Sequence, residues 1–277
     1  ALAGNTRLNR TSYPYLRNEL NLILDGYDRY MDNNGDAWSI YVDLLPSNLK
    51  AGVLTNYDDP PKELKYLDEL RKSSQNVCPM CGSEKAVNLD HILTKEHHPQ
   101  WAVFSKNLVP ACKCNTDRGT VLTGEIGSRQ RILHPYFDQC LSNRLLSCRI
   151  TPDQQFRLAD IELVYIHAGL PEHESIKFHT EKIVKPGLVL WLDSQWAQLR
   201  RNPCDLIQTI PTNLVQSVGD MRAHLNDAMT RFDRRTGSQN NWNSILIHGL
   251  LASDHVVEWL LAQHNGIISG DIDPEDN

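Results

Sequence analysis

The sequence lacks long apolar runs, an excess of positive charge and the common nucleotide-binding signatures. Over its 277 residues no stretch approaches the ~20 apolar residues that a membrane span needs, and the mean hydropathy is −0.44. The first ten residues are polar and contain no hydrophobic segment of a signal peptide. There is no Walker loop, Gly-x-Ser-x-Gly elbow or dinucleotide fingerprint. These absences exclude membrane proteins and secreted mini-proteins, and they predict a cytoplasmic protein without a membrane partner.

The charge of the chain is unevenly distributed. It has 28 Lys and Arg against 34 Asp and Glu, a net charge of −6, which by itself disfavours nucleic-acid binding. Residues 71–131 nevertheless carry a net +4, whereas the rest of the chain carries −10. A basic segment in an acidic chain indicates a site for a polyanion, although an ordinary fluctuation of surface charge would give the same pattern.

Cysteines gather in one short region. Four of the seven lie between residues 78 and 114, as Cys78-Pro-Met-Cys81 and Cys112-Lys-Cys114. In the reducing cytoplasm that we expect, clustered thiols indicate a metal site rather than disulfides. Four thiolates in two close pairs are typical of a structural tetrahedral zinc site, and Gly82 permits the tight turn after the first pair.

The second cysteine pair leaves two ligand sets open, because a Cys-x-Cys bite is more strained than Cys-x-x-Cys. Either both Cys112 and Cys114 bind zinc, or one of them binds and His97 or His98 completes the site. The other three cysteines are expected to be small buried side chains: Cys140, Cys148 and Cys204.

Apolar periodicity predicts an α+β chain in four segments. Residues 1–75 form an N-terminal helical segment, with one helix from Thr11 or Ser12 and a second from Asp59. Residues 76–150 hold the cysteine-rich region and a connector. In the connector, His134 before Pro135 either helps the site or packs as a buried turn histidine, and packing is the favoured role. Residues 151–270 form a mainly helical C-terminal domain, and 271–277 an acidic tail.

Within these segments the expected elements are as follows. The apolar face of the first helix comprises Leu16, Leu20, Ile23, Leu24, Tyr27 and Met31. Strands are expected at Phe156–Ile166 and Ile176–Val184, and helices at Val189–Arg200, Pro211–Phe232 and Trp242–His264.

Asp90-His91, Asn107 and Asn115 lie between or beside the cysteine pairs, in that order. On these residues, the segment 76–120 resembles the HNH endonucleases, the ββα-metal finger of nuclease colicins, homing enzymes and one domain of CRISPR effector nucleases. A zinc-bound subset of that family brackets the same residues with cysteine pairs. The chain departs from the family pattern in its shortened second pair and in Thr94, where many relatives have proline.

The resemblance implies a site with named roles. Asp90 and Asn115 would hold Mg²⁺ or Mn²⁺ through oxygen atoms, and His91 would act as the general base on water. Because neighbours on a regular strand point to opposite faces, a regular strand could not aim both Asp90 and His91 at one site. The resemblance implies that the pair stands at a strand end that runs into a loop. Asn107 would tie down the loop that orients His91.

Four basic residues near the site are candidates for phosphate contact: Lys95, Lys106, Lys113 and Arg118. Each polar residue of the site also has a structural alternative. Asp90-His91 is compatible with a surface or core pair, Asn107 with a turn cap and Asn115 with a helix cap.

The predicted function is therefore that of a metal-dependent phosphodiester hydrolase that nicks or cuts DNA, leaving 5′-phosphate and 3′-hydroxyl ends; RNA is not excluded. The resemblance implies an effector of a bacterial restriction or anti-phage system. Two alternatives stay open: a zinc module that binds nucleic acid without cutting, and an effector subunit that is silent until a regulatory or sensor protein engages its C-terminal region.

Overall fold

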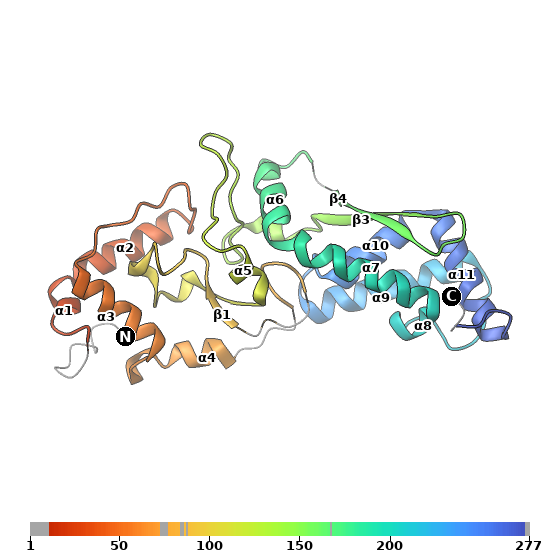
Figure 1. Cartoon of the computed structure of the whole chain (residues 1–277), viewed down its shortest axis with the longest axis horizontal. Helices are drawn as coiled ribbons and strands as arrows, with labels where there is room; N and C mark the ends of the chain where they lie inside the picture. Colours follow the sequence, from red (N-terminus) through yellow and green to blue (C-terminus); the bar gives the residue numbers. More distant parts are fainter. Residues whose placement is uncertain (1–10, 73–76, 84–85, 87, 167, 275–277) are drawn as a thin grey trace. The chain divides into compact units, whose positions relative to one another are not determined.

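The computed structural model describes residues 11–72, 77–83, 86, 88–166 and 168–274 (Figure 1). Helices predominate, and the described strands form two separate two-stranded antiparallel sheets, which confirms the α+β class. The chain forms two compact units. The first comprises Ala1–Met80, Lys85–Gln139 and Glu174–Ile183, and the second Cys81–Glu84, Cys140–His173 and Val184–Asn277. The helices predicted for residues 1–75 thus share a unit with most of the cysteine-rich segment.

Short helices line the N-terminal part of the first unit. They are α1 (Tyr15–Asn18), α2 (Leu20–Asp32), α3 (Ser47–Asp58), the 3₁₀ turn η2 (Lys62–Leu64) and α4 (Tyr66–Lys72). Their apolar side chains join those of the cysteine-rich segment in one hydrophobic core: Leu16, Ile23, Leu49, Val53, Leu64, Leu67, Leu89, Val103 and Leu108. Burial of this shared core fixes the N-terminal helices to the segment that carries the candidate site.

The predicted apolar face of the first helix is only partly correct. Leu16 and Ile23 are buried, but Leu24 and Met31 are exposed, while Tyr30 is fully buried. Within α2 the buried residues are Ile23, Gly26 and Tyr30, at a spacing of three and four, so Leu24 and Met31 lie beside the buried face rather than on it. Helix α3 was not expected from the sequence.

The cysteine-rich segment folds as strand, strand and helix. Strands β1 (Asn88–His91) and β2 (Leu108–Ala111) are antiparallel, with Asn88 opposite Ala111 and His91 opposite Leu108. The loop between them contains the 3₁₀ turns η3 (Pro99–Trp101) and η4 (Ser105–Asn107). Helix α5 (Lys113–Asp117) follows β2 directly, so the end of β2 and the start of α5 place their side chains beside β1.

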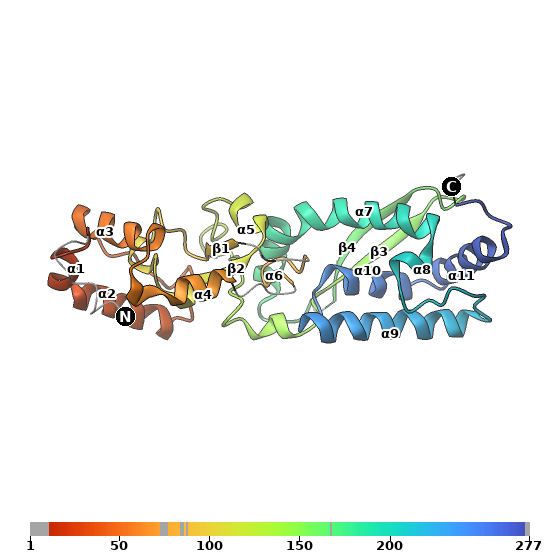
Figure 2. The same ribbon diagram turned by 90° about the horizontal axis from the view of Figure 1, so that it is seen from below.

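The second unit is built on a β-hairpin covered by helices. Strands β3 (Leu146–Pro152) and β4 (Ala159–Tyr165) pair with Leu146 opposite Tyr165. Helix α7 (Lys185–Arg201) packs on β4, and α10 (Trp242–Leu251) packs on β3 (Figure 2). Helices α8 (Pro203–Leu206), α9 (Val218–Thr236) and α11 (Asp254–Ser269) complete the unit. Gly249 lets α10 approach closely, since a Cβ there would lie 2.2 Å from Cys148 Sγ.

Several sequence predictions in the C-terminal half are wrong, and the helix expected at Pro211–Phe232 is α9, which begins only at Val218. The expected strand at Ile176–Val184 is helical, formed by α6 (His173–His179) and a π-helical turn, η6 (Thr180–Val184). Its buried residues follow the helical spacing of three and four: Ile176, His179, Thr180, Ile183 and Val184. The true partner of β4 is β3, in the segment expected to be a connector, which also contains the 3₁₀ turn η5 (Gln139–Ser142).

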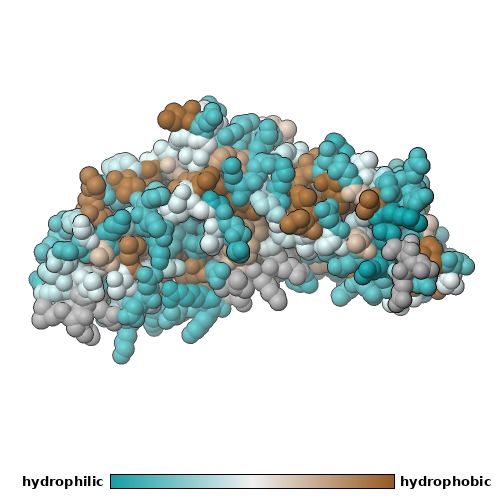
Figure 3. All heavy atoms as spheres, in the orientation of Figure 1, coloured by the Kyte–Doolittle hydropathy of each residue, from teal (hydrophilic) through white to brown (hydrophobic). Residues whose placement is uncertain are grey.

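The long helix expected at Trp242–His264 is two helices. It breaks after Leu251, and the Ser253 side chain caps the new helix by accepting from the backbone N–H of Val256. Among the described helices none alone is long and apolar enough to cross a membrane; α10 and α11 reach that length only as a pair bent by 102°. On the face drawn in Figure 3, hydrophobic atoms form small separate areas. Of the predicted acidic tail, residues 275–277 lie outside the described residues.

Candidate metal and catalytic site

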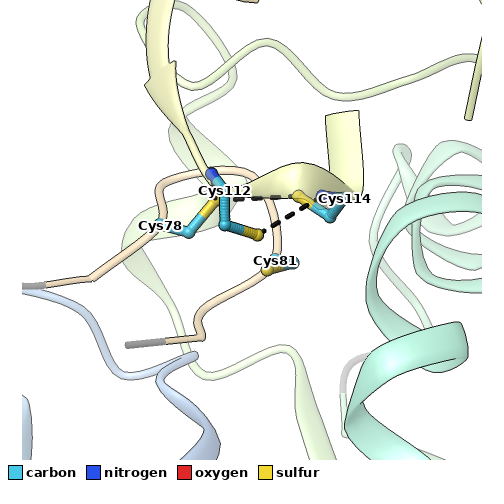
Figure 4. A group of neighbouring side chains, drawn as sticks. All are labelled: Cys78, Cys81, Cys112 and Cys114. Atoms are coloured by element: carbon cyan, nitrogen blue, oxygen red, sulfur yellow. Dashed lines mark hydrogen bonds between the residues drawn. The ribbon is translucent and has the colours of Figure 1, made fainter. Parts of the chain in front are cut away.

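The four clustered cysteines are brought together in space. Their Sγ atoms all lie within 4.8 Å of one another, and the Sγ atoms of Cys78 and Cys114 are 3.7 Å apart (Figure 4). A tetrahedral zinc ion with Zn–S bonds of about 2.3 Å has sulfur–sulfur distances of about 3.8 Å. The four side chains therefore lie close enough to bind one metal ion, and a tetrahedral thiolate site fits them.

Backbone geometry resolves how the short second pair contributes. Cys112 is the N-cap of α5, and its Sγ accepts the backbone N–H of Cys114 at 3.4 Å. The backbone N–H of Cys112 donates to Cys78 Sγ at 3.3 Å. The tight turn from β2 into α5 thus lets both thiols face Cys78. Among the described residues, the group close enough to bind a metal ion contains only these cysteines, without His97 or His98.

His91 is the last residue of β1 and is 5% exposed. Its Nε2 lies 2.9 Å from the carbonyl oxygen of Ala102. A carbonyl oxygen only accepts hydrogen bonds, so Nε2 carries the proton and Nδ1 carries the lone pair. Burial lowers the pKa of His91 below its ordinary 6.5, partly offset by the bond to Ala102, which favours a neutral imidazole at pH 7.

Asp90 lies beside His91 and is half-buried. One carboxylate oxygen accepts the backbone N–H of His91 at 2.8 Å, and the other accepts the hydroxyl of Thr116, on α5, at 3.1 Å. A carboxylate has about four acceptor positions, so both oxygens retain a lone pair for a hard cation. Sequence reasoning missed Thr116, for which the pattern offers no signal.

Asn115 on α5 and Arg118, the residue after α5, both bind the same strand end. The Asn115 side-chain amide donates to the carbonyl oxygen of His91 at 3.0 Å, and its Oδ1 accepts from Arg118 Nε at 2.7 Å. Asn115 is inside α5 rather than its N-cap, so the alternative of a helix cap does not hold.

The guanidinium nitrogens of Arg118 all donate to acceptors within the protein, which disfavours a phosphate contact. Arg118 is 7% exposed and donates to the carbonyl oxygens of His91, Ile92 and Val121 at 3.1, 2.5 and 2.8 Å. Burial lowers the pKa of Arg118 to about 10, so it stays charged at neutral pH. Arg118 is therefore positioned to hold the end of β1 in place rather than to contact substrate.

Replacing Arg118 with glutamine is expected to lower the free energy of unfolding by about 3 kcal/mol, because several carbonyl oxygens lose a charged donor. Lys113→Gln is the matched control. The Lys113 side chain is 81% exposed and its ion pair with Asp117 spans 3.5 Å, so the expected change is below about 0.5 kcal/mol. Urea unfolding of both variants measures the difference, and equal effects would contradict the bracing role.

Asn107 is fully buried at the end of η4 and joins the two ends of the loop between β1 and β2. Its Oδ1 accepts the backbone N–H of Leu93 at 2.8 Å, and its Nδ2 donates to the carbonyl oxygens of Leu93 and Trp101 at 3.0 and 3.3 Å. A simple turn cap would not engage both ends. Tyr30, which sequence reasoning missed, lies with its hydroxyl 3.2 Å from Asn107 Oδ1.

The three lysines predicted to contact phosphate lie in different surroundings. Lys106 and Lys113 are exposed, and Lys106 Nζ lies 5.5 Å from the centre of the Tyr136 ring. Lys95 is half-buried, with Nζ 2.8 Å from the Asp58 carboxylate. A phosphate role for these lysines stays a prediction.

Two buried histidines of the first unit, His134 and His179, are expected to make folding sensitive to acid. Burial lowers the pKa of each to about 4, from an ordinary 6.5, so the folded state holds the neutral form. Stability is therefore complete above pH 6.5 and falls as the pH drops from 6.5 to 4, by up to about 3 kcal/mol for His134. Urea midpoints between pH 7.5 and 5 should fall less steeply in His134→Gln than in wild type. The control is His97→Gln, at an exposed site. If the slope of His134→Gln is as steep as that of this control, the result counts against the prediction.

Comparison with known proteins finds a similarity to a phage protein. No family model matches the chain, and no solved structure matches it. The chain is 34% identical over 110 residues to protein ea31 of Escherichia phage lambda. The match covers 35% of this chain and 36% of the phage protein, so it spans about a third of that relative's length, and the relative's name states no activity.

Proposed function

We propose that the protein is a metal-dependent endonuclease of the HNH type that nicks or cuts DNA. The observation that carries the proposal is the convergence of Asp90, His91 and Asn115 on one strand end, beside a cluster of four cysteines. Thr116 bonds to Asp90, and Asn115 bonds to the carbonyl of His91, so α5 holds both residues of the Asp-His pair. A structural finger that only binds nucleic acid would not need this arrangement.

His91 would serve as the general base. With Nε2 committed to the Ala102 carbonyl, Nδ1 is the nitrogen that can accept a proton from an attacking water. The neutral form at pH 7, favoured by burial, is the form that a base requires. His91 is buried, and the Tyr57 ring lies 4.4 Å from its imidazole, so the protein fixes its orientation on several sides.

Asp90 and Asn115 would hold the catalytic cation. Both offer oxygen, which suits Mg²⁺ or Mn²⁺. A carbonyl oxygen has two lone pairs, and Arg118 uses one on Asn115 Oδ1. A divalent ion bound there would neutralise phosphate charge and stabilise the departing oxygen.

The cysteines would hold a structural zinc ion. Cys114 precedes Asn115, and Cys112 follows the end of β2, the strand paired with Asp90 and His91. A metal that fixes Cys112 and Cys114 to Cys78 therefore fixes the start of α5 against the sheet. Zinc would contribute to catalysis indirectly, by holding Asn115 and Thr116 beside β1.

The substrate that we propose is DNA, with exposed Lys106 and Lys113 as the first candidates for phosphate contact. Nothing in the site selects against a 2′-hydroxyl, so RNA is a second substrate to test. We further propose that the acidic region 150–277 contacts a regulatory or sensor protein, as in an effector of a restriction or anti-phage system.

Metal-dependent conversion of supercoiled plasmid by wild type and Asp90→Asn tests the proposal. Wild type is expected to nick with Mg²⁺ or Mn²⁺, and Asp90→Asn to be at least about 100-fold slower because the cation loses its charged ligand. Asp117→Asn, on the exposed side of α5, is the control and should nick like wild type. Equal rates for wild type and Asp90→Asn would refute the assigned cation site.

A further inference from the structure

A buried hydrogen-bond relay links helix α2 to the loop that holds His91. Its members are Tyr30 on α2, His134 in the segment after α5, and Asn107 at the end of η4, all fully buried in the first unit. Tyr30 Oη lies 2.9 Å from His134 Nε2 and 3.2 Å from Asn107 Oδ1. Three segments that are distant in the sequence therefore meet at one tyrosine hydroxyl.

The direction of each hydrogen bond in the relay is fixed. The backbone N–H of Tyr136 donates to His134 Nδ1 at 3.2 Å, so Nδ1 has the lone pair and Nε2 has the proton. Nε2–H donates to Tyr30, and the phenolic proton is then directed to Asn107 Oδ1, with the carbonyl of Lys106 as a second acceptor at 3.4 Å. The relay thereby specifies which end of the Asn107 amide is oxygen.

The orientation of Asn107 directs its amide donor to the residue that precedes Ala102. With Oδ1 facing Tyr30 and the N–H of Leu93, Nδ2 donates to the carbonyls of Leu93 and Trp101. Trp101 directly precedes Ala102, whose carbonyl accepts from His91 Nε2. Residues 93–107 are thus closed into a loop by Asn107, and that loop presents the group that orients His91.

The surroundings leave the relay little freedom to rearrange. A Cβ on Gly35 would lie 2.6 Å from His134 Cδ2 and 2.8 Å from Tyr30 Cε1, so the backbone packs directly on both rings. Trp101 Nε1 donates to the carbonyl of Gly26 on α2 at 2.9 Å, a second tie between this helix and the loop. Burying polar groups costs stability unless they are hydrogen-bonded. Phenylalanine in place of Tyr30 and leucine in place of His134 would fill the same space without that cost. What the polar relay adds is a specific orientation of the Asn107 amide.

We propose that Tyr30 and His134 are positioning residues for His91, acting through Asn107 and the carbonyl of Ala102. The inference rests on the proposed nuclease function, and it assigns part of the site's machinery to helix α2, outside the strand–strand–helix segment. Neither residue touches substrate or cation. Their effect is to hold the imidazole of His91 in one orientation and one tautomer.

Tyr30→Phe tests the proposal by removing one hydroxyl, with cleavage measured on a fluorescent DNA duplex with Mn²⁺. The expected result is a kcat about tenfold lower with KM unchanged, because orientation of the base affects the chemical step and not DNA binding. Tyr27→Phe is the matched control on the same helix. Tyr27 stacks on Phe104 at 4.3 Å, and among the described residues its buried hydroxyl has no hydrogen-bond partner. Its loss should leave kcat unchanged.

Two changes at His134 separate positioning from simple packing. His134→Gln retains a donor toward Tyr30 and should keep near-wild-type kcat, whereas His134→Leu removes it and should lower kcat about as much as Tyr30→Phe. Equal kcat values for Tyr30→Phe, His134→Leu and wild type would overturn the proposal. So would equal losses in His134→Gln and His134→Leu, since the donor would then not matter.

A readout without cleavage distinguishes this proposal from the proposed function. In ¹⁵N-labelled full-length protein, the His91 ring should show a single Nε2–H tautomer with a slowly exchanging proton, and Tyr30→Phe should speed that exchange at least about tenfold. If wild type does not cut DNA but this shift is seen, the nuclease function fails and the relay stands. If wild type cuts and Tyr30→Phe changes neither exchange nor kcat, the relay is refuted.

Discussion

Replacing His91 is expected to abolish DNA cleavage while leaving the protein folded. General-base catalysis contributes about 10²–10⁴-fold, so His91→Ala should reduce the rate of nicking to near background. Alanine also removes the donor to the Ala102 carbonyl, which adds a stability loss of about 1–3 kcal/mol. Plasmid nicking and the unfolding midpoint, measured on the same preparation, separate the two effects.

His91→Gln separates the loss of the base from the loss of the hydrogen bond to the Ala102 carbonyl. A glutamine side chain can donate to the Ala102 carbonyl but cannot take a proton from water at neutral pH. This variant should be as inactive as His91→Ala and closer to wild type in stability. The exposed neighbour His97 provides the control, since His97→Ala should cut normally. Residual activity of His91→Gln near the wild-type level would mean that another group acts as the base.

Loss of a cysteine from the cluster is expected to cause the largest fall in stability. Four sulfurs within 4.8 Å are suited to one metal ion, and structural zinc ions can supply about 10 kcal/mol of folding free energy in small zinc domains. Cys78→Ser should lose the metal and destabilise the first unit by several kcal/mol, because Cys78 contacts both Cys112 and Cys114. A strong chelator should have the same effect on wild type.

Metal content by elemental analysis and thermal unfolding with and without chelator measure this effect. Cys204→Ser is the control, a buried thiol of the second unit outside the cluster, and it should keep a full equivalent of zinc. Cys114→Ser decides the role of the short second pair. A full zinc content and unchanged stability in that variant would show that four thiolates are not required.

The cysteine spacing, together with the resemblance, predicted the cysteine cluster and the place of the Asp-His pair in the fold. The spacing of the cysteines predicted their cluster, because two short pairs on turns need only one chain reversal to meet. The expectation that Asp90 and His91 stand at a strand end agrees with β1, which ends at His91. Asn107 was placed on the loop by the resemblance, and it lies at the end of η4, directly before β2.

Long-range packing decided what the sequence could not show. Whether an arginine faces solvent or carbonyl oxygens depends on where β1 ends relative to α5, so Arg118 was predicted as a phosphate contact and lies buried instead. Strand pairing is likewise non-local, and the segment at β3 contains no turn or alternation strong enough to identify it as the partner of β4. Tyr30 was missed because its role depends on His134 and Asn107, more than 70 residues away.

The central claim is that this site hydrolyses DNA, and the product ends of a nicked plasmid test it most directly. Wild-type protein with Mg²⁺ or Mn²⁺ should convert supercoiled plasmid to nicked circles that DNA ligase reseals, since cleavage is expected to leave 5′-phosphate and 3′-hydroxyl ends. His91→Gln should leave the plasmid supercoiled. Plasmid that stays supercoiled with excess wild-type protein and either cation, or nicks that persist equally in His91→Gln, would contradict the account.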